Sequence, residues 1–189
     1  MLDYLTHEAD VAEQLQHLIS GGNLSYDLFT NGNYDKLSLY VSAQHVARDS
    51  YYGAEQDLGG YGDTKNLTTS VGAQYNLNSD HFLFAPSTTV FGIDNTNDNL
   101  RDVKLGAEGE ENVTLFDQYS NTLGTFVQQD WKTEKVNFSL GLRYDYYWIK
   151  DTESVSDNPS GGVLVPRAGL LYKLTPDLRF RVGYARGYR

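Results

Sequence analysis

The sequence predicts an all-β fold, an antiparallel up-and-down sheet of about eight strands that crosses a membrane as a β-barrel. Three observations predict it: alternating apolar and polar residues, connections that alternate between short and long, and a composition rich in strand and turn formers. The 189 residues include 18 Gly and 15 Tyr. No run of about 18 apolar residues occurs, but a membrane-spanning strand needs only about 9–11 residues of alternating character.

The charge and cysteine counts exclude several classes of protein. Fifteen Lys and Arg stand against 25 Asp and Glu, which gives a formal net charge of −10. Nucleic acid is therefore not an expected partner, because neutralising phosphates requires a surplus of basic residues. The chain has no Cys, so it has no disulfide, thiolate metal site or Cys nucleophile.

Residues 1–22 differ from the rest of the chain. Val11, Leu15, Leu18 and Ile19 have partial helical spacing, and the segment is acidic. We expect residues 1–22 to form the end of an outer loop or a short helix, and residues 23–189 to form the barrel portion.

The clearest strand is predicted over residues 135–149. Apolar or aromatic side chains occupy every even position from Val136 to Trp148, and most odd positions are polar or Gly. This period of two indicates a strand with one apolar face, longer than the usual strand of about 5–6 residues.

Seven further segments alternate less cleanly, and Pro86 counts against the fourth of them. In chain order they are residues 24–30, 37–47, 67–77, 82–93, 123–131, 164–174 and 178–188.

The connections alternate in length. The expected short ones are residues 31–35, 78–80, 132–134 and 175–177, and the long ones are residues 49–64, 94–119 and 150–162. Tight turns at one end and long loops at the other are typical of outer-membrane barrels.

Two stretches of the last third resemble the barrel of TonB-dependent outer-membrane receptors. Residues 122–151, TLGTFVQQDWKTEKVNFSLGLRYDYYWIKD, resemble a strand pair of that family, and residues 165–189, VPRAGLLYKLTPDLRFRVGYARGYR, resemble the next pair. RDSYYG at 48–53 and GYGDTKN at 60–66 resemble loops of the vitamin B12 and siderophore branch. The resemblance implies about eight strands of a larger barrel, since family barrels have 22.

The resemblance also implies a function. Such receptors lie in the outer membrane of Gram-negative bacteria and import scarce nutrients such as ferric siderophores or cobalamin. Expected partners are outer-membrane lipid, a small-molecule or metal-chelate ligand, and the inner-membrane TonB complex acting through a plug domain that this sequence does not contain. We therefore expect this polypeptide not to transport by itself, and we expect no enzymatic activity.

Arg143, Asp145 and Tyr147 lie on the polar face of the strand over 135–149. They are candidates for contact with a ligand or plug in the lumen. The sequence favours a second interpretation, a ladder of salt bridges and hydrogen bonds that keeps strands in register.

Trp131 and Trp148 are expected near opposite ends of neighbouring strands. In a barrel they would belong to the two aromatic girdles at the membrane interfaces. The alternative is the aromatic core of a β-protein outside a membrane.

Asp94, Asp98 and Asp102 are the candidate metal ligands, in the acidic segment DNTNDNLRD. Such oxygen ligands suit Ca²⁺, which some members of the resembled branch bind in outer loops. The spacing fits no EF-hand, and the sequence favours a solvated acidic loop without a cofactor. The histidines show no zinc-site spacing.

Two other classes of function stay open at this level. One is a self-contained eight-stranded outer-membrane barrel with a structural or lipid-related role. The other is a soluble up-and-down barrel that binds a small ligand in its mouth.

Overall fold

Eight antiparallel strands form one sheet in a computed structural model that describes residues 12–32, 34–53, 58–105, 111–152 and 158–187. The spatial order follows the chain order, so the predicted all-β, up-and-down barrel segment is confirmed. The strands are β1 (Ala12–Thr30), β2 (Asp35–Gly53), β3 (Tyr61–Phe82), β4 (Ala85–Leu105), β5 (Glu111–Lys132), β6 (Val136–Asp151), β7 (Ser160–Lys173) and β8 (Arg179–Ala185). A single 3₁₀ turn, η1 (Leu58–Gly60), precedes β3.

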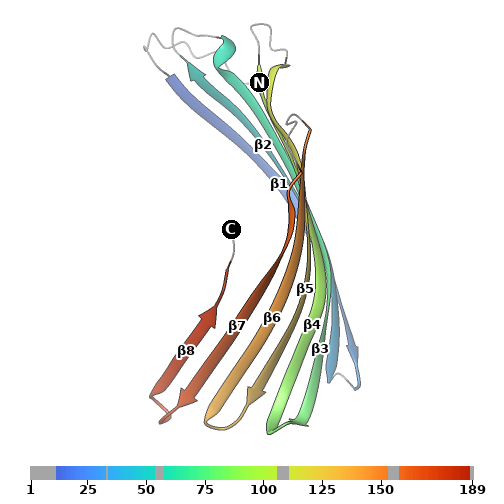
Figure 1. Ribbon diagram of the computed structural model, residues 1–189, viewed down its shortest axis with the longest axis vertical. Helices are drawn as coiled ribbons and strands as arrows, with labels where there is room; N and C mark the ends of the chain where they lie inside the picture. Colours follow the sequence, from blue (N-terminus) through green and yellow to red (C-terminus); the bar gives the residue numbers. More distant parts are fainter. Residues whose placement is uncertain (1–11, 33, 54–57, 106–110, 153–157, 188–189) are drawn as a thin grey trace.

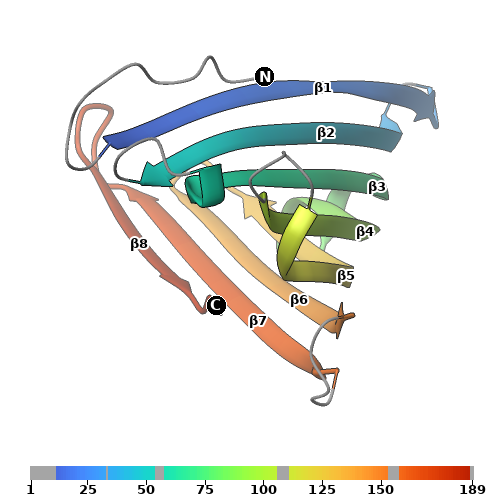
Figure 2. The ribbon, with the colours of Figure 1, turned by 90° about the horizontal axis from the view of Figure 1, so that it is seen from above.

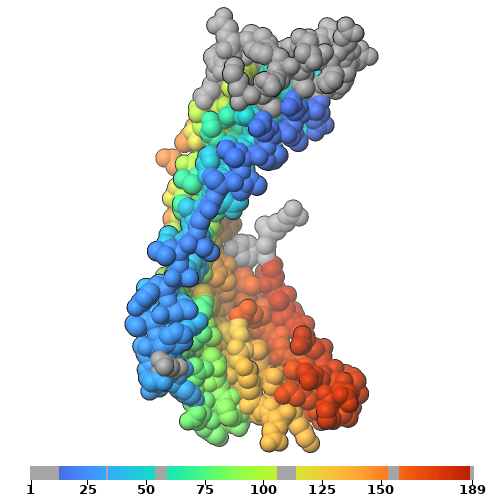
Figure 3. Space-filling view, turned by 180° about the vertical axis from the view of Figure 1, so that it is seen from behind, coloured from blue at the N-terminus to red at the C-terminus, as the bar shows by residue number. Residues whose placement is uncertain are grey.

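The sheet is one curved layer (Figures 1 and 2). Tight turns gather at its lower end in Figure 1, and the strand ends between which the longer connections run lie at the upper end. Among the described residues β1 and β8 do not pair with each other, so the sheet has two free edges. Figure 3 shows the strands following one another from blue to red across the surface.

The strand register separates an apolar face from a polar one. One row across the sheet consists of directly paired residues, and nearly all of them are apolar or aromatic: Tyr26, Leu39, Ala73, Ile93, Thr125, Tyr144 and Leu164. We call this face the outer face. Its side chains are open to the surroundings; Val71 is 54% exposed and Leu142 is 44% exposed.

The height of this apolar band suits a bilayer. In β6 it runs from Val136 to Trp148, which is roughly 40 Å along a strand at about 3.3 Å per residue. A tilt of about 45° would reduce this to roughly 28 Å, close to the apolar band of about 25 Å in membrane barrels. Within the described residues no helix has the length and hydropathy needed to cross a membrane.

The start of the chain differs from the expectation. Residues 12–22 belong to β1, so the short helix or loop expected over 1–22 is wrong for them, and residues 1–11 lie outside the described residues. Every residue from Ala12 to Thr30 pairs with β2. A continuous ladder outweighs a partial helical pattern, especially in a segment that contains Gly21 and Gly22.

The strands also extend farther than their periodicity indicates. The acidic loop expected over 94–119 is mostly strand, because β4 continues to Leu105 and β5 begins at Glu111. Residues 94–99 of β4 are polar on both faces, so the alternation disappears there while the backbone ladder to β3 and β5 continues.

The turn expected at 78–80 is likewise wrong. Strand β3 continues to Phe82, and Leu83 and Phe84 form the turn before Ala85. Pro86 fits next to a register shift between Ser79 and Phe82, where a missing backbone donor is tolerated.

Candidate functional site on the inner face

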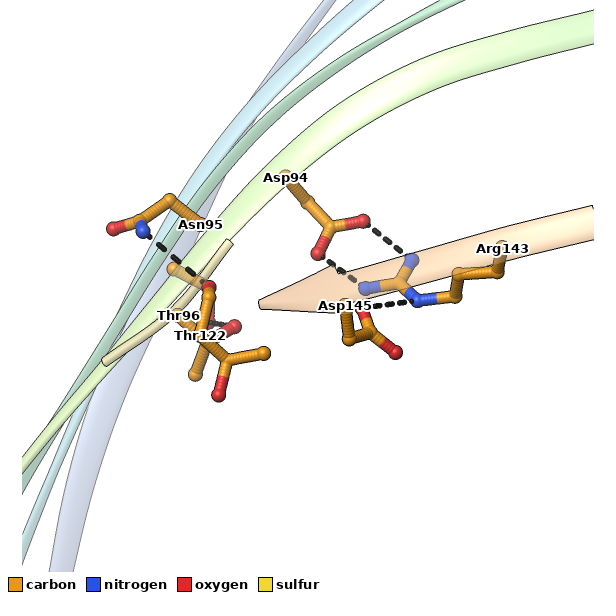
Figure 4. Close-up of polar contacts among 7 residues, drawn as sticks. Asp94, Asn95, Thr96, Thr122, Arg143 and Asp145 are labelled. Carbon is orange, nitrogen blue, oxygen red and sulfur yellow. Dashed lines mark hydrogen bonds and ion pairs between the residues drawn. The ribbon is translucent and has the colours of Figure 1, made fainter. Parts of the chain in front are cut away.

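The face opposite the apolar band, here called the inner face, is lined by polar side chains and glycines. One row of paired residues crosses it near the middle of the sheet: Tyr40, Gly72, Asp94, Gly124 and Asp145. Figure 4 shows Asp94 and Arg143 on the concave side of the curved strands, with Asn95 on the other side.

Arg143 connects β4 to β6 across the intervening β5. Its Nη1 and Nη2 donate to the two carboxylate oxygens of Asp94, each at 2.7 Å, and its Nε donates to Asp145 Oδ1 at 2.8 Å (Figure 4). The Asp145 side chain is 5% exposed and that of Arg143 is 34% exposed. The bidentate ion pair between Arg143 and Asp94 is of a kind that is both strong and geometrically specific.

Gly124 makes this arrangement possible. A Cβ at that position would lie 2.0 Å from Arg143 Nη2 and 2.7 Å from Asp145 Oδ1. The guanidinium therefore lies flat against β5 between its two carboxylates. Two carboxylates against one guanidinium leave the cluster with one net negative charge, which favours a cation or a hydrogen-bond donor on any occupant of the concave space.

Other large side chains also lie flat over glycines of the neighbouring strand. The Tyr40 ring covers Gly72, where a Cβ would lie 2.4 Å from the Tyr40 ring carbon Cζ. The remaining pairs are Phe126 over Gly92 and Arg167 over Gly141. Arg143 also lies 5.9 Å from the centroid of Phe126. This arrangement holds the side chains against the wall and leaves the concave space open.

The three predicted lumen residues are only partly brought together. Arg143 and Asp145 form one cluster with Asp94. Tyr147 lies on the same face two residues further along β6, where its hydroxyl group lies over Gly161 rather than joining the cluster.

The three candidate metal ligands do not converge. Asp94, Asp98 and Asp102 share one face of β4 at intervals of four residues, which separates neighbours by about 13 Å along the strand. Asp94 binds Arg143, while Asp98 and Asp102 accept hydrogen bonds from Thr68 and Thr64. Among the described residues no group of three acidic or histidine side chains is arranged to hold a metal.

Both tryptophans lie on the outer face, at opposite ends of the apolar band. Trp131 is paired with Phe138 near the tight turns, and Trp148 is paired with Asn121 toward the long connections. This is the placement that interfacial girdles require.

The long connections are shorter than the sequence predicts. Much of the ranges 49–64, 94–119 and 150–162 is strand, and residues 54–57, 106–110 and 153–157 lie outside the described residues. Within the range 49–64, Tyr51 of β2 is 2% exposed, and its ring centroid lies 4.7 Å from that of Tyr61 of β3. These two rings pack the end of β2 against the start of β3.

The first tight turn is tied to the neighbouring strand. The Tyr34 hydroxyl donates to Asp80 Oδ1 at 2.5 Å, and Asn78 N donates to Asp35 Oδ1 at 2.8 Å. The hydrogen bond to Asp80 raises the pKa of Tyr34 above its ordinary value of 10.0, because losing the proton would place two negative charges together.

The sequence interpretation missed the role of Asp94. It assigned Asp94 to a loop, whereas the structure makes it the main partner of Arg143. The only available signal was the even spacing of Asp94, Asp98 and Asp102, which fits one face of a continued strand.

Comparisons with known proteins agree with this architecture. The family model described as "TonB dependent receptor-like, beta-barrel" matches residues 3–189. No match is found among curated proteins.

Two solved structures share the fold. A chain in the structure of the FpvAI–pyocin S2 complex has a TM-score of 0.69 and 14% identity over 88% of this chain and 25% of that chain. The ferric citrate transporter FecA in the unliganded form has a TM-score of 0.63 and 14% identity over 89% of this chain and 27% of that chain. The chain thus spans about a quarter of each matched chain.

Strand order, the division into an apolar and a polar face, and the match to nearly the whole sequence agree with one another. The chain belongs to the TonB-dependent receptor family and forms part of its β-barrel.

Proposed function

We propose that this chain is a wall segment of an outer-membrane transporter that imports a scarce nutrient, with ferric chelates of the siderophore class as the cargo. The observation that carries the proposal is the pairing of a bilayer-high apolar outer face with a polar, concave inner face in a chain of this family. One of the matched structures is a ferric citrate transporter, which favours an iron chelate over cobalamin.

The two free sheet edges support a larger barrel. Strands β1 and β8 each leave one row of backbone groups unpaired within the described sheet. Unpaired backbone groups in lipid cost several kcal/mol each. Further strands added at these edges would remove that cost, whereas a self-contained eight-stranded barrel would require β1 to pair with β8.

In this proposal the two faces have different tasks. The outer face contacts outer-membrane lipid, with the tight turns on the periplasmic side and the long connections outside the cell. The cluster of Asp94, Arg143 and Asp145 contacts the plug or the passing cargo. The TonB complex of the inner membrane supplies the energy through the plug.

Uptake measurements test the proposal. A strain that lacks the full-length protein should regain uptake of a radiolabelled ferric siderophore when the protein is restored, and should lose it again when TonB is deleted. Uptake that persists without TonB would reject the energy source. If the restored protein takes up cobalamin but no ferric siderophore, the proposed iron cargo is rejected. If it takes up neither ligand, the proposed transport function is rejected.

A further inference from the structure

The β3–β4 turn carries a run of consecutive exposed apolar side chains. Phe82 ends β3 and Leu83 and Phe84 form the turn; these three residues, here called the Phe82–Phe84 turn, are 47%, 69% and 60% exposed. The β5–β6 turn contains Thr133, Glu134 and Lys135. In the β7–β8 turn the exposed Leu174 and Leu178 are separated by Thr175, Pro176 and Asp177, so no apolar run forms there. Three consecutive exposed apolar residues in one turn therefore require a separate explanation.

The backbone of this turn is unfavourable for leucine. Leu83 has a φ of 64°, and Phe84 N donates to Phe82 O at 2.9 Å across it. Gly or Asn adopts a positive φ at lower cost than a bulky residue. The position thus carries a large apolar side chain against the preference of its own backbone.

Three stacked rings fix the turn to the outer face. Phe84 lies 5.4 Å from Trp131 with an interplanar angle of 20°, and Trp131 lies 5.6 Å from Phe138 with an angle of 19°. The Trp131 Nε1 donates to Phe82 O at 3.1 Å, and Trp131 is 6% exposed. The stack makes the apolar turn continuous with the lower border of the apolar band.

We propose that the Phe82–Phe84 turn inserts into the boundary between headgroups and acyl chains of the phospholipid leaflet on the tight-turn side. Aromatic side chains favour that boundary, and Leu83 adds an exposed apolar side chain between the two Phe residues. Burial in lipid offsets the unfavourable backbone, while the polar β5–β6 turn stays in water. This inference rests on the proposed function in one respect, namely that the sheet spans a membrane.

Site-specific fluorescence tests the insertion. Leu83→Cys is introduced into a cysteine-free background of the full-length protein, labelled with an environment-sensitive fluorophore and reconstituted into phosphatidylcholine vesicles. Glu134→Cys at the polar β5–β6 turn is the matched control, and Leu142→Cys marks the middle of the apolar band. Each label is quenched by nitroxides attached to shallow or deep lipid positions, and by iodide in water.

The expected result is a blue-shifted Leu83 label that shallow lipid nitroxides quench and iodide does not, beside a Glu134 label that only iodide quenches. Leu83 emission like that of Glu134 would overturn the inference, even with Leu142 quenched by deep nitroxides. A Leu83 label protected from every quencher would also overturn it, because a protein would then cover the turn. Failure of lipid to quench Leu142 would instead reject the membrane-spanning sheet.

Discussion

At the scale of single residues, Arg143 is the side chain on which the inner face most depends. It satisfies two carboxylates from strands that do not touch each other, and Asp145 is almost completely buried. Removing the cation would leave both carboxylates facing each other without a partner. The cluster therefore adds a side-chain cross-link to the backbone ladder between β4 and β6.

Replacement of Arg143 tests this role. Arg143→Met should destabilise the full-length protein by about 2 kcal/mol, between the values typical of exposed and of fully buried pairs. Arg143→Lys should recover part of this loss, because an ammonium cannot bind Asp94 with two parallel hydrogen bonds. Denaturant unfolding in lipid vesicles measures both variants.

Arg167→Met is the matched control for Arg143→Met. It removes a guanidinium from the same face of the sheet, but this guanidinium forms no ion pair with a described carboxylate. An equal loss of stability in the control would contradict a specific role for the Asp94–Arg143–Asp145 cluster.

Tyr34 supplies a prediction about pH at the turn end. Its pKa is raised in the folded protein, so the contribution of its hydrogen bond to Asp80 is fully present below pH 10 and is lost as pH rises through the folded pKa. Subtracting the ultraviolet titration curve of Tyr34→Phe from that of the unmodified protein leaves the titration of Tyr34. The midpoint of this difference curve should lie above pH 10. Asp80→Asn should move that midpoint down, and an unchanged midpoint would contradict the assignment.

At the scale of strands, the sequence predicted best where one face is apolar and the other polar. The strand expected over 135–149 is observed at 136–151, because alternation persists along most of it. The prediction failed for 94–119, where inner aspartates and outer asparagines give no alternation. It failed at 12–22 because strand pairing is a long-range interaction that local spacing does not encode.

The candidate site could be predicted only in part for the same reason. Arg143 and Asp145 are two residues apart, so the alternation placed them on one face. Their partner Asp94 is 49 residues from Arg143 and reaches it only through the register of three strands.

The glycine of the central row provides a test at the strand scale. Gly124→Val should displace Arg143 and destabilise the protein by about 1–3 kcal/mol, as overpacking usually does. Gly169→Ala is the matched control, since its added Cβ would meet only Ser139 Cβ at 3.8 Å. Unfolding in lipid vesicles compares the two.

In a Gly124→Val background, the further cost of Arg143→Met should largely disappear, because both changes break the same contacts. Additive effects of the two substitutions would contradict the close packing of Arg143 on Gly124.

At the scale of the whole molecule, the environment and stability of the protein depend on the two different faces of one curved sheet. A single strand layer has no room for a conventional core, and only Tyr51, Ala85, Val103 and Trp131 are buried apolar residues in the described part. Stability must therefore come from the backbone ladder and from the surroundings of the outer face. In water such a surface would promote aggregation, whereas in a bilayer it is the expected exterior.

The most direct measurement is a nitroxide scan along β6, from Leu140 to Tyr147, in the full-length protein in native outer membranes. Accessibility to oxygen, which concentrates in lipid, should peak at Leu140, Leu142, Tyr144 and Tyr146. Accessibility to a water-soluble nickel chelate should show no peak at these four positions. A peak in nickel-chelate accessibility at the even positions would contradict a lipid-facing outer wall and a polar interior. An oxygen accessibility that does not alternate from one residue to the next would contradict them as well.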